Sequence, residues 1–593
     1  MKDFIIEDNT LIEYDGDEDV VIIPNNVTKI DYDAFDYSEI NKIIIHKNLY
    51  DIEEGAFKKC FDLEEIIVDD KNPFYISIDG ILYSKDRKTL IAYPVNKSNK
   101  TFMVPDEVKE ISLEAFRYSK NLSELILPNS LTKIGYRAFS KSSIEKINIP
   151  KNVKTLPQKA FKNSLNLKTV ELSDNLTVIE NKAFVNCEKL KDLTLPKGLK
   201  YIGDNVFDNC KSLEKITIPK NVEFFGEGIF DSCENLKSVK IDAKIKMLPK
   251  GFLYRCNNLT DFQIPESVTK IGEYALYFCE NLKEIKIPEK VWYIGKWAFV
   301  NCFNVKTIKI PENVKSMGEG ILGGNFLEKA DFGDNEHFTI IDEVVYSKNM
   351  KKLLYYPAYK TDKSFTIPDS VERIGDNAFS NCNRLEYVKF PNNLKEIGSC
   401  SFESCGIREV NLPISCKSLD YSAFYSCNNL TKINIPGVKE IGPWGFSRCR
   451  SLKEITLPNT LKEISMKMFS TCPLLETVHI PDSVKYIEEG AFQRCESIKE
   501  IEIPKSVKFF GAKSFKGCTN LKSLIIPEKV TTINGEQFKD CINLESITIP
   551  KTLTEINSKA FMNCPKLKSI KINKKTRIYD DDLSKHIKIE YYK

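Results

Sequence analysis

The stretch LEKITIPKNVEFFGEGIF, residues 213–230, is one copy of a pattern that recurs along almost the whole chain. Its general form is L-x-x-I-x-I-P-x-x-V-x-x-I-G-x-x-A-F-x-x-C, and its phenylalanine is the clearest landmark. So many equivalent units predict a repeat architecture. We count 21 copies, whose landmarks are Phe35, Phe57, Phe116, Phe139, Phe161, Phe184, Phe207, Phe230, Phe252, Phe299, Phe379, Phe402, Phe424, Phe446, Phe469, Phe492, Phe515, Phe538 and Phe561, with leucine at Leu276 and Leu322.

The period limits the kind of unit. Successive landmarks are mostly 23 residues apart, and this spacing lies within the range of leucine-rich repeats, roughly 20 to 29 residues. Inside the unit, β-branched residues alternate with polar ones, which indicates a half-buried strand with Ile216 and Ile218 inward and Thr217 outward. Pro219 cannot donate a hydrogen bond to a sheet, so it should end the strand.

One coil cannot bury its apolar residues alone, whereas stacked coils bury them together. The expected fold is therefore a β-rich solenoid: a curved leucine-rich repeat with a parallel β-sheet, wound as a right-handed superhelix of 21 coils of about 23 residues. We expect six segments along the chain: an N-terminal cap with the first two repeats (1–60), a first β-hairpin island (61–101), ten repeats (102–325), a second island (326–364), nine repeats (365–570) and a C-terminal cap (571–593).

The two islands break the period. Each contains two strand-like runs around a polar turn, FYISIDGILYSKDRKTLIAYP at 74–94 and FTIIDEVVYSKNMKKLLYYP at 338–357, which is a β-hairpin signal. The similarity of the two island sequences indicates an internal duplication or a standard family insert. We expect each hairpin to continue the sheet stack, and the alternative is a protruding contact surface. Two coils, at 245–252 and 435–446, each lack about one residue, which predicts local kinks.

The segments IPEKVWYIGKWAFVNCFNV (287–305) and IPDSVKYIEEGAFQRCESI (480–498) resemble the BspA-like, or Treponema-type, class of leucine-rich repeat. The resemblance covers nearly all of residues 20–570. It implies a leucine-rich repeat fold. For function it implies a broad group: surface adhesins, host-protein binders and uncharacterised proteins of bacteria and parasitic protists.

Charge and terminal composition bear on partners and location. The chain has 86 basic and 83 acidic residues, a net charge of +3, so no overall field attracts nucleic acid or an anionic membrane. The first twenty residues carry acidic side chains where a signal peptide needs an apolar run, and no stretch approaches 18 apolar residues. We expect no nucleic-acid partner, no membrane insertion and a cytoplasmic location. The alternative is the cell surface or secretion by an unconventional route.

Sixteen of the 18 cysteines occupy one position of the repeat, mostly three residues after the landmark. A cysteine that recurs once per coil is typical of a small buried apolar side chain. We therefore expect reduced thiols, although stacked coils would bring these residues near enough for disulfides in an oxidising compartment. Zinc is disfavoured, because there is no CxxC pair and the four histidines are scattered.

No nucleophile with a base, paired carboxylates, phosphate-binding glycine loop or metal-ligand cluster rises above the repeat pattern. We expect no enzyme activity and no cofactor. The hypothesis is an interaction scaffold that binds a protein or glycan through its extended surface, adhesin-like by resemblance; the alternative is a structural protein that self-associates, and the oligomeric state stays open. Candidate ligand-binding residues are the aromatic residues at variable positions and the outward positions of the strands: Trp292, Tyr293, Trp297, Lys286, Lys309, Lys389, Asn411, Asn434 and His479.

Overall fold

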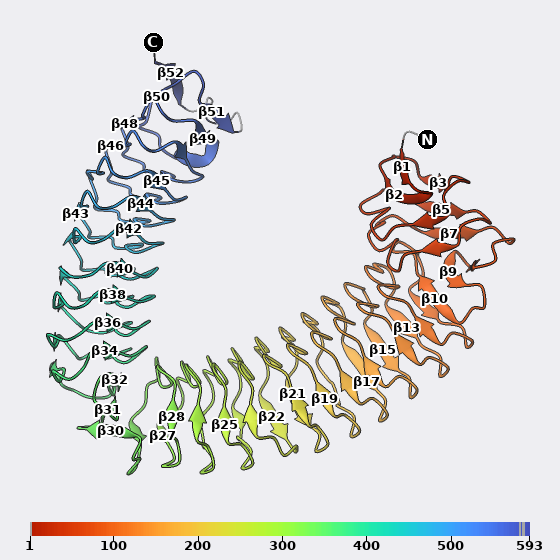
Figure 1. The fold of residues 1–593 in the computed structure, drawn as a ribbon, viewed down its shortest axis with the longest axis horizontal. Coiled ribbons are helices and arrows are strands. Elements are labelled where there is room, and N and C mark those ends of the chain that lie inside the picture. Colours follow the sequence, from red (N-terminus) through yellow and green to blue (C-terminus); the bar gives the residue numbers. More distant parts are fainter. Residues whose placement is uncertain (1–2, 580–582, 584–586, 593) are drawn as a thin grey trace. The chain divides into compact units, whose positions relative to one another are not determined.

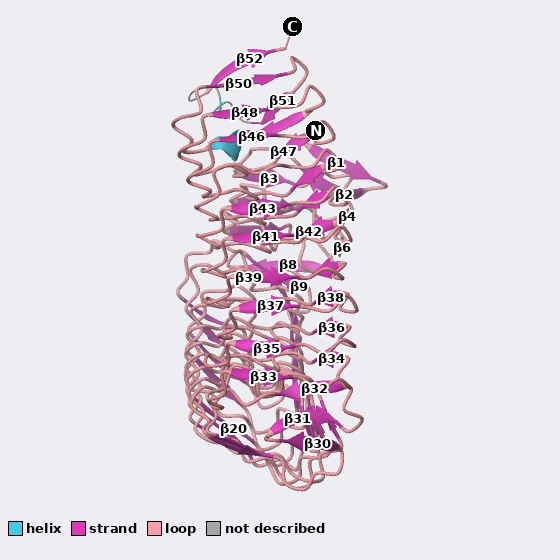
Figure 2. Cartoon of the chain, turned by 90° about the vertical axis from the view of Figure 1, so that its left-hand side faces the viewer, coloured by secondary structure: helices cyan, strands magenta, loops and turns pink. Residues whose placement is uncertain are grey.

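The computed structural model describes residues 3–579, 583 and 587–592. The chain forms two compact units, Met1–Val305 and Lys306–Lys593. Each unit is a stack of coils that carry short parallel strands (Figures 1 and 2). A short 3₁₀ helix, η1 (Ser558–Phe561), lies near the end of unit 2. The β-solenoid with a period of about 23 residues is thus confirmed.

In unit 1 most coils contribute a first strand, which we call the long strand, and a second strand of two residues, which we call the short strand. The long strands are β3 (Val20–Ile22), β5 (Lys42–Ile45), β7 (Glu65–Val68), β11 (Thr101–Met103), β13 (Glu124–Ile126), β15 (Lys146–Ile149), β17 (Thr169–Leu172), β20 (Lys215–Ile218), β22 (Ser238–Ile241) and β24 (Asp261–Phe262). The short strands are β4 (Lys29–Ile30), β6 (Asp51–Ile52), β12 (Glu110–Ile111), β14 (Lys133–Ile134), β16 (Thr155–Leu156), β18 (Val178–Ile179), β19 (Tyr201–Ile202), β21 (Phe224–Phe225), β23 (Met247–Leu248), β25 (Lys270–Ile271) and β26 (Tyr293–Ile294).

Unit 2 repeats this arrangement. Its long strands are β27 (Thr307–Lys309), β29 (Lys329–Asp331), β33 (Ser364–Thr366), β35 (Tyr387–Lys389), β37 (Glu409–Asn411), β39 (Lys432–Asn434), β41 (Glu454–Thr456), β43 (Thr477–His479), β46 (Ser523–Ile525), β48 (Ser546–Thr548), β50 (Ser569–Ile572) and β52 (Lys588–Tyr591). Its short strands are β28 (Ser316–Met317), β34 (Arg373–Ile374), β36 (Glu396–Ile397), β38 (Ser418–Leu419), β40 (Glu440–Ile441), β42 (Glu463–Ile464), β44 (Tyr486–Ile487), β45 (Phe509–Phe510), β47 (Thr532–Ile533), β49 (Glu555–Asn557) and β51 (Arg577–Tyr579).

The long strands pair in parallel and alternate between the interior and solvent. In β20, Ile216 and Ile218 are buried while Thr217 is exposed, as the pattern predicts, because successive side chains of a strand point to opposite faces. The register places Thr217 beside Lys240 of the next coil. Equivalent residues of neighbouring coils therefore form columns along each unit.

Two interior columns hold the coils together. Landmark rings stack from coil to coil, with centroids 5.4 Å apart for Phe161 and Phe184. Where a coil has a cysteine at the repeat position, the cysteine lies beside these rings: Cys187 Sγ donates to Phe161 O over 3.2 Å. All eighteen cysteines are buried, which confirms the predicted buried position.

One predicted landmark is wrong. The landmark position of its coil is occupied by Leu253, not Phe252, because Leu253 N donates to Ala275 O and Leu253 O accepts from Cys279 Sγ, as landmarks do elsewhere. Phe252 takes the preceding, alanine position and lies 6.0 Å from the Phe225 ring. This coil therefore keeps the regular spacing, so the missing residue predicted at 245–252 is also wrong.

The segment 435–446 does contain a shortened turn. Gly437 passes so close to the preceding coil that an added Cβ would lie 2.1 Å from Ile414 O, which no other residue type could tolerate. The long-strand sheet containing β37 and β39 stops there, and a separate sheet begins at β41. The ladder is thus interrupted beside the shortened turn.

Each island has three strands where the sequence predicted two. In unit 1, β8 (Tyr75–Ile78), β9 (Ile81–Ser84) and β10 (Thr89–Ala92) form an antiparallel meander. The additional strand was hidden because the tight turn at Asp79 and Gly80 lies inside what looked like one apolar run. In unit 2, β30 (Phe338–Ile341), β31 (Val344–Ser347) and β32 (Lys352–Tyr355) repeat the meander.

The meanders continue the stack, as expected. Strand β10 pairs in parallel with the short strand β12, and β32 pairs likewise with β34. The residue after each meander occupies the landmark column: Tyr93 stacks on Phe116 at 5.1 Å and Tyr356 on Phe379 at 5.1 Å. Each meander therefore supplies a coil whose landmark is tyrosine, which the phenylalanine count missed.

These meander coils lack the turn that normally follows the short strand. As a result, the coils on either side touch directly, and we call each such contact a seam. In unit 1, Leu113 N donates to Glu54 Oε2 over 3.2 Å. In unit 2, Asp376 N donates to Glu319 Oε2 over 3.2 Å.

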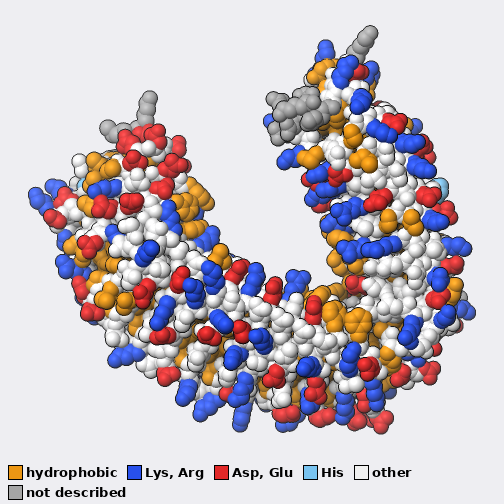
Figure 3. Space-filling view, turned by 180° about the vertical axis from the view of Figure 1, so that it is seen from behind, with side chains coloured by type: hydrophobic (Ala, Val, Ile, Leu, Met, Phe, Trp, Pro, Cys, Tyr) orange, Lys and Arg blue, Asp and Glu red, His pale blue; other side chains and the backbone are white. Residues whose placement is uncertain are grey.

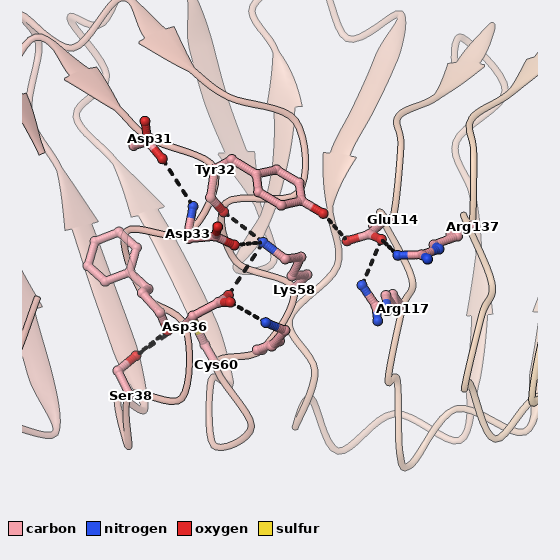
Figure 4. A network of polar contacts seen from close by, with 12 residues as sticks. Asp31, Tyr32, Asp33, Asp36, Ser38, Lys58, Cys60, Glu114, Arg117 and Arg137 are labelled. Atoms are coloured by element: carbon pink, nitrogen blue, oxygen red, sulfur yellow. Dashed lines mark hydrogen bonds and ion pairs between the residues drawn. The ribbon is translucent and has the colours of Figure 1, made fainter. Parts of the chain in front are cut away.

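Buried charges fill the seam of unit 1 (Figure 4). Lys58 Nζ lies 2.7 Å from Asp33 Oδ1 and 3.2 Å from the centre of the Tyr32 ring. Glu114 accepts from Arg117 Nη1 at 2.7 Å, and a neighbouring cavity of about 10 Å³ remains. A position without its regular turn is thus closed by polar side chains.

Both ends of the chain carry extra pairing. Strands β1 (Phe4–Glu7) and β2 (Thr10–Tyr14) form a hairpin, and β2 joins the short strand β4. At the other end, β52 pairs in parallel with β50. The predicted C-terminal cap at 571–593 lies partly outside the described residues.

Candidate ligand-binding face

The predicted site residues fall into two sets on different strands. Five occupy long strands and the sixth, Lys286, takes the equivalent position of a coil that has no long strand; all six are exposed, as the outward-facing alternation predicts: Lys286, Lys309, Lys389, Asn411, Asn434 and His479. The three aromatic residues, Trp292, Tyr293 and Trp297, lie in or beside the short strand β26. The structure therefore places the two kinds of predicted residue on different sheets of the coil stack.

The long-strand residues form columns with polar neighbours. Asn411 lies beside Asn434 in the parallel register of β37 and β39. His479 lies beside Thr456, and Lys389 lies beside Thr366. None of these side chains is needed to fill the interior, so this face is available for contacts with another molecule.

A groove lies over the long strands of unit 1. Its volume is about 1310 Å³, and the outward residues of four successive coils line it: Thr194, Thr217, Lys240 and Gln263. Acidic and basic side chains are mixed around it, and Lys240 Nζ lies 3.0 Å from Asp242 Oδ1. The groove suits a polar ligand of either charge sign.

Sequence reasoning missed Lys240 in this column. Lys240 could have been identified from the sequence, because it lies between the apolar residues Val239 and Ile241 in the usual alternation. The strand was overlooked because Asp242 stands where other coils have proline. In unit 2 a smaller groove of about 440 Å³ includes the predicted Asn411 and Asn434.

The aromatic candidates pack mainly against neighbouring coils. Trp292 is 38% exposed, and Lys270 Nζ lies 4.8 Å from the centre of its ring. Trp297 is half-buried, stacks on Tyr277 at 6.0 Å and meets Tyr274 edge-on. Its φ of 58° is left-handed, a conformation that bulky residues rarely adopt.

Charges on the drawn face are interspersed in sign, with blue and red side chains alternating over most coils (Figure 3). Many opposite charges meet across neighbouring coils, as Lys168 and Glu145 do at 2.6 Å. Exposed pairs of this kind contribute little to stability, about 0 to 1 kcal/mol each. These pairs do limit the electrostatic field that charges of one sign would otherwise produce at the surface.

A sequence profile of the BspA type leucine-rich repeat region matches this chain in six copies. The copies cover residues 18–79, 93–214, 154–283, 200–328, 355–476 and 462–590. The chain belongs to the BspA-type leucine-rich repeat family. A search of curated proteins gave no match.

The solved structures similar to this BspA-type chain include three bacterial proteins. A leucine rich cell surface protein from Faecalibacterium prausnitzii is 22% identical over 80% of this chain and 94% of its own, with a TM-score of 0.30. A leucine-rich repeat protein from Bacteroides ovatus is 20% identical over 88% and 98%, with a TM-score of 0.28. A Treponema pallidum leucine rich repeat protein is 24% identical over 40% and 90%, with a TM-score of 0.24.

The cysteines of this BspA-type chain are poor nucleophiles. Burial raises the pKa of Cys60 and of Cys472 to about 12. Burial is the largest cause for both thiols, and hydrogen bonds offset it only in part. Because the thiolate is the attacking form, little of the reactive species is present at neutral pH.

Two further features bear on chemistry and location. Among the described residues there is no group of three or more His, Cys, Asp or Glu side chains placed to hold a metal ion. No helix in the described part of the chain has the length and apolar character that crossing a membrane would need.

Proposed function

We propose that this protein is a non-enzymatic interaction scaffold that binds a protein or glycan ligand along its long-strand face. The observation that carries the proposal is the groove over β20, β22 and β24, which is lined by exposed side chains that the fold does not use. Parallel stacking repeats these outward positions from coil to coil, and solenoid proteins use extended surfaces of stacked repeats for binding.

The test uses the full chain, immobilised and exposed to glycan arrays and to cell lysate. A variant with Lys240→Ala and Gln263→Ala removes two outward side chains from the groove without touching the interior. A matched control, Thr548→Ala with Lys571→Ala, changes exposed long-strand residues of unit 2 that lie outside both grooves. We expect the first variant to lose a ligand that the control retains. Equal retention by both variants and the unmodified chain would remove the groove from the proposal.

A second candidate function is self-association as a structural or assembly protein. It is favoured by apolar side chains exposed on the short-strand side of unit 1, where Phe224 and Met247 are each 49% exposed. A concentration series in analytical ultracentrifugation separates the two functions. A single monomeric species throughout the series would count against assembly.

We further propose a cytoplasmic location with reduced thiols, supported by the burial of the cysteines inside the coils; an adhesin-like protein at the cell surface is the competing proposal. Thiol labelling of freshly isolated, denatured protein distinguishes them. Labelling of nearly all eighteen cysteines supports the reducing compartment, whereas labelling of a few indicates disulfides and an extracellular setting.

A further inference from the structure

Three lysines of unit 1 lie on the turn edge, which we define as the residues from three before to three after each landmark. Lys159 and Lys162 flank the landmark Phe161, and Lys182 takes the position of Lys159 in the next coil. The corresponding residues around Phe515 in unit 2 are Lys513, Lys516 and Glu536. At these three positions the two places differ by one reversal of charge, Lys182 in unit 1 against Glu536 in unit 2.

The backbone at the two places is the same. Lys159 N donates to the next coil at Asn181 O over 3.1 Å, and Lys513 N donates to Gly535 O over 3.2 Å. The left-handed φ angles also agree, at 59° for Lys159 and 58° for Lys513. A side chain at one place therefore starts from an equivalent position at the other.

In unit 2 a carboxylate neutralises this arrangement. Glu536 Oε2 accepts from Lys516 Nζ at 2.7 Å, and Glu536 Oε1 lies 3.5 Å from Lys539 Nζ. Lys513 Nζ lies 3.6 Å from Glu489 Oε1. The geometry thus allows an anionic oxygen to reach the lysine that follows the landmark.

In unit 1 both acidic positions have changed, because Tyr136 stands in place of Glu489 and Lys182 in place of Glu536. Lys159 Nζ donates to the Tyr136 hydroxyl over 2.9 Å. None of Lys159, Lys162 and Lys182 forms an ion pair with any residue the structure describes. Burial, followed by the nearby cations Lys159, Lys182 and Arg137, lowers the pKa of Lys162.

We propose that Lys159, Lys162 and Lys182 bind a sulfate or phosphate group. Such an oxyanion would occupy the place that the Glu536 carboxylate fills in unit 2, where it accepts hydrogen bonds from lysine. Stacking like charges in neighbouring coils is unfavourable, and a bound anion offsets that cost. Lysine is a common phosphate ligand that acts as a point charge.

The surroundings limit the size of the anionic ligand. Asp208 and Asp231 follow Lys162 in the same column two and three coils further on, and Asp208 interacts electrostatically with both Lys162 and Lys182. These carboxylates would repel a long polyanion lying along the column. The site therefore fits one anionic group, either as a free ion or as an ester on a larger ligand.

Isothermal titration of the full chain tests the site with inorganic sulfate, inorganic phosphate and glucosamine 6-sulfate, with unsulfated glucosamine as control. We expect saturable binding of the oxyanions and none of the unsulfated sugar. Tighter binding of the ester than of free sulfate identifies a ligand that carries the group; tighter binding of the free ions identifies an ion site. Failure of all three anionic probes would overturn the proposal.

Two variants test whether the charge pattern determines oxyanion binding. Lys182→Glu restores the carboxylate that Glu536 supplies in unit 2, and the variant is expected to fold while binding the oxyanions at least tenfold more weakly. Glu536→Lys should create a second site and raise the stoichiometry from one to two. Undiminished binding by Lys182→Glu would refute the assignment, whatever happens at the long-strand groove.

Discussion

The two meanders create the same break in the turn edge, yet the two seams close it with charges buried to different depths. In unit 1 the side chains of Lys58 and Glu114 are 2% and 0% exposed. In unit 2 those of Glu319 and Arg373 are 18% and 20% exposed. The comparison teaches that the same insertion was accommodated in two ways: the central charges of the network are fully buried in unit 1 and partly exposed in unit 2.

The partners explain the difference. Glu114 lies between two arginines and also accepts a hydrogen bond from Tyr32, 3.3 Å away. Arg373 instead faces four carboxylates, and two of them are more than a third exposed: Glu396 and Asp420. Water can therefore compensate for a lost partner in unit 2 far better than in unit 1.

The largest effect is expected for Glu114→Gln. The substitution leaves Arg117, whose side chain is 11% exposed, beside a neutral group. Removing one member of a buried ion pair costs about 3–5 kcal/mol. Hydrogen exchange of the amides around residues 50–60 and 110–120 should show this loss in the free energy of local opening.

A matched variant separates charge from packing. Adding Arg117→Met to Glu114→Gln removes the unpaired cation, and replacing buried ion pairs by apolar groups is often neutral. Most of the protection should return. If the double variant is as unprotected as the single one, the ion pair is not what closes this seam.

A smaller, pH-dependent effect is expected in unit 2. Burial tends to raise the pKa of Glu319, but Arg373 and Lys352 outweigh it, so the pKa lies below the ordinary 4.5. A carboxyl with a lowered folded pKa contributes stability that is present above its unfolded pKa and is lost as pH falls.

Glu319→Gln should therefore cost about 2 kcal/mol at neutral pH, the scale of hydrogen bonds to charged groups. This loss of stability should shrink as the pH falls below 4.5. The Glu319 carboxyl of the unmodified protein then becomes protonated and neutral, as the glutamine of the variant always is. Chemical denaturation at pH 7 and at pH 3 measures both values. A cost that is equal at the two pH values would contradict the role given to the charge.

Much of the fold could be predicted from the sequence, because every repeat shows the same pattern of inward and outward residues. Alternation identified the inward Ile216 and Ile218, and a once-per-coil position identified the buried cysteines. Phe252 was wrongly counted as a landmark, because a phenylalanine by itself does not show which position of the repeat it occupies. The hydrogen bond from Leu253 to the next coil resolves it.

The seams could not be predicted, because they depend on contacts between residues that no period relates. Nothing local to Glu54 or Leu113 indicates that a missing turn brings them together. The site was predictable only in part for a similar reason. Alternation shows that Asn411 and Asn434 face outward, but a groove depends on how neighbouring coils are spaced.

The smallest effect tests how each meander fills the landmark column. The Tyr93 hydroxyl is buried and has no hydrogen-bond partner among the described residues, and burial raises its pKa to about 12. The Tyr356 hydroxyl instead donates to Asp362 Oδ2 over 3.2 Å. An unsatisfied buried hydroxyl is unfavourable, whereas a satisfied one contributes about 1 kcal/mol.

Tyr93→Phe should therefore leave the free energy of unfolding unchanged or raise it by about 1 kcal/mol, while Tyr356→Phe should lower it by about 1 kcal/mol. Both variants keep the aromatic ring and its stacking on the next landmark, so packing is matched between them. Chemical denaturation of the full chain at pH 7 compares the two. Effects of the same sign would show that the hydroxyl groups do not distinguish the two meanders, and that the difference between the seams resides in the ion networks alone.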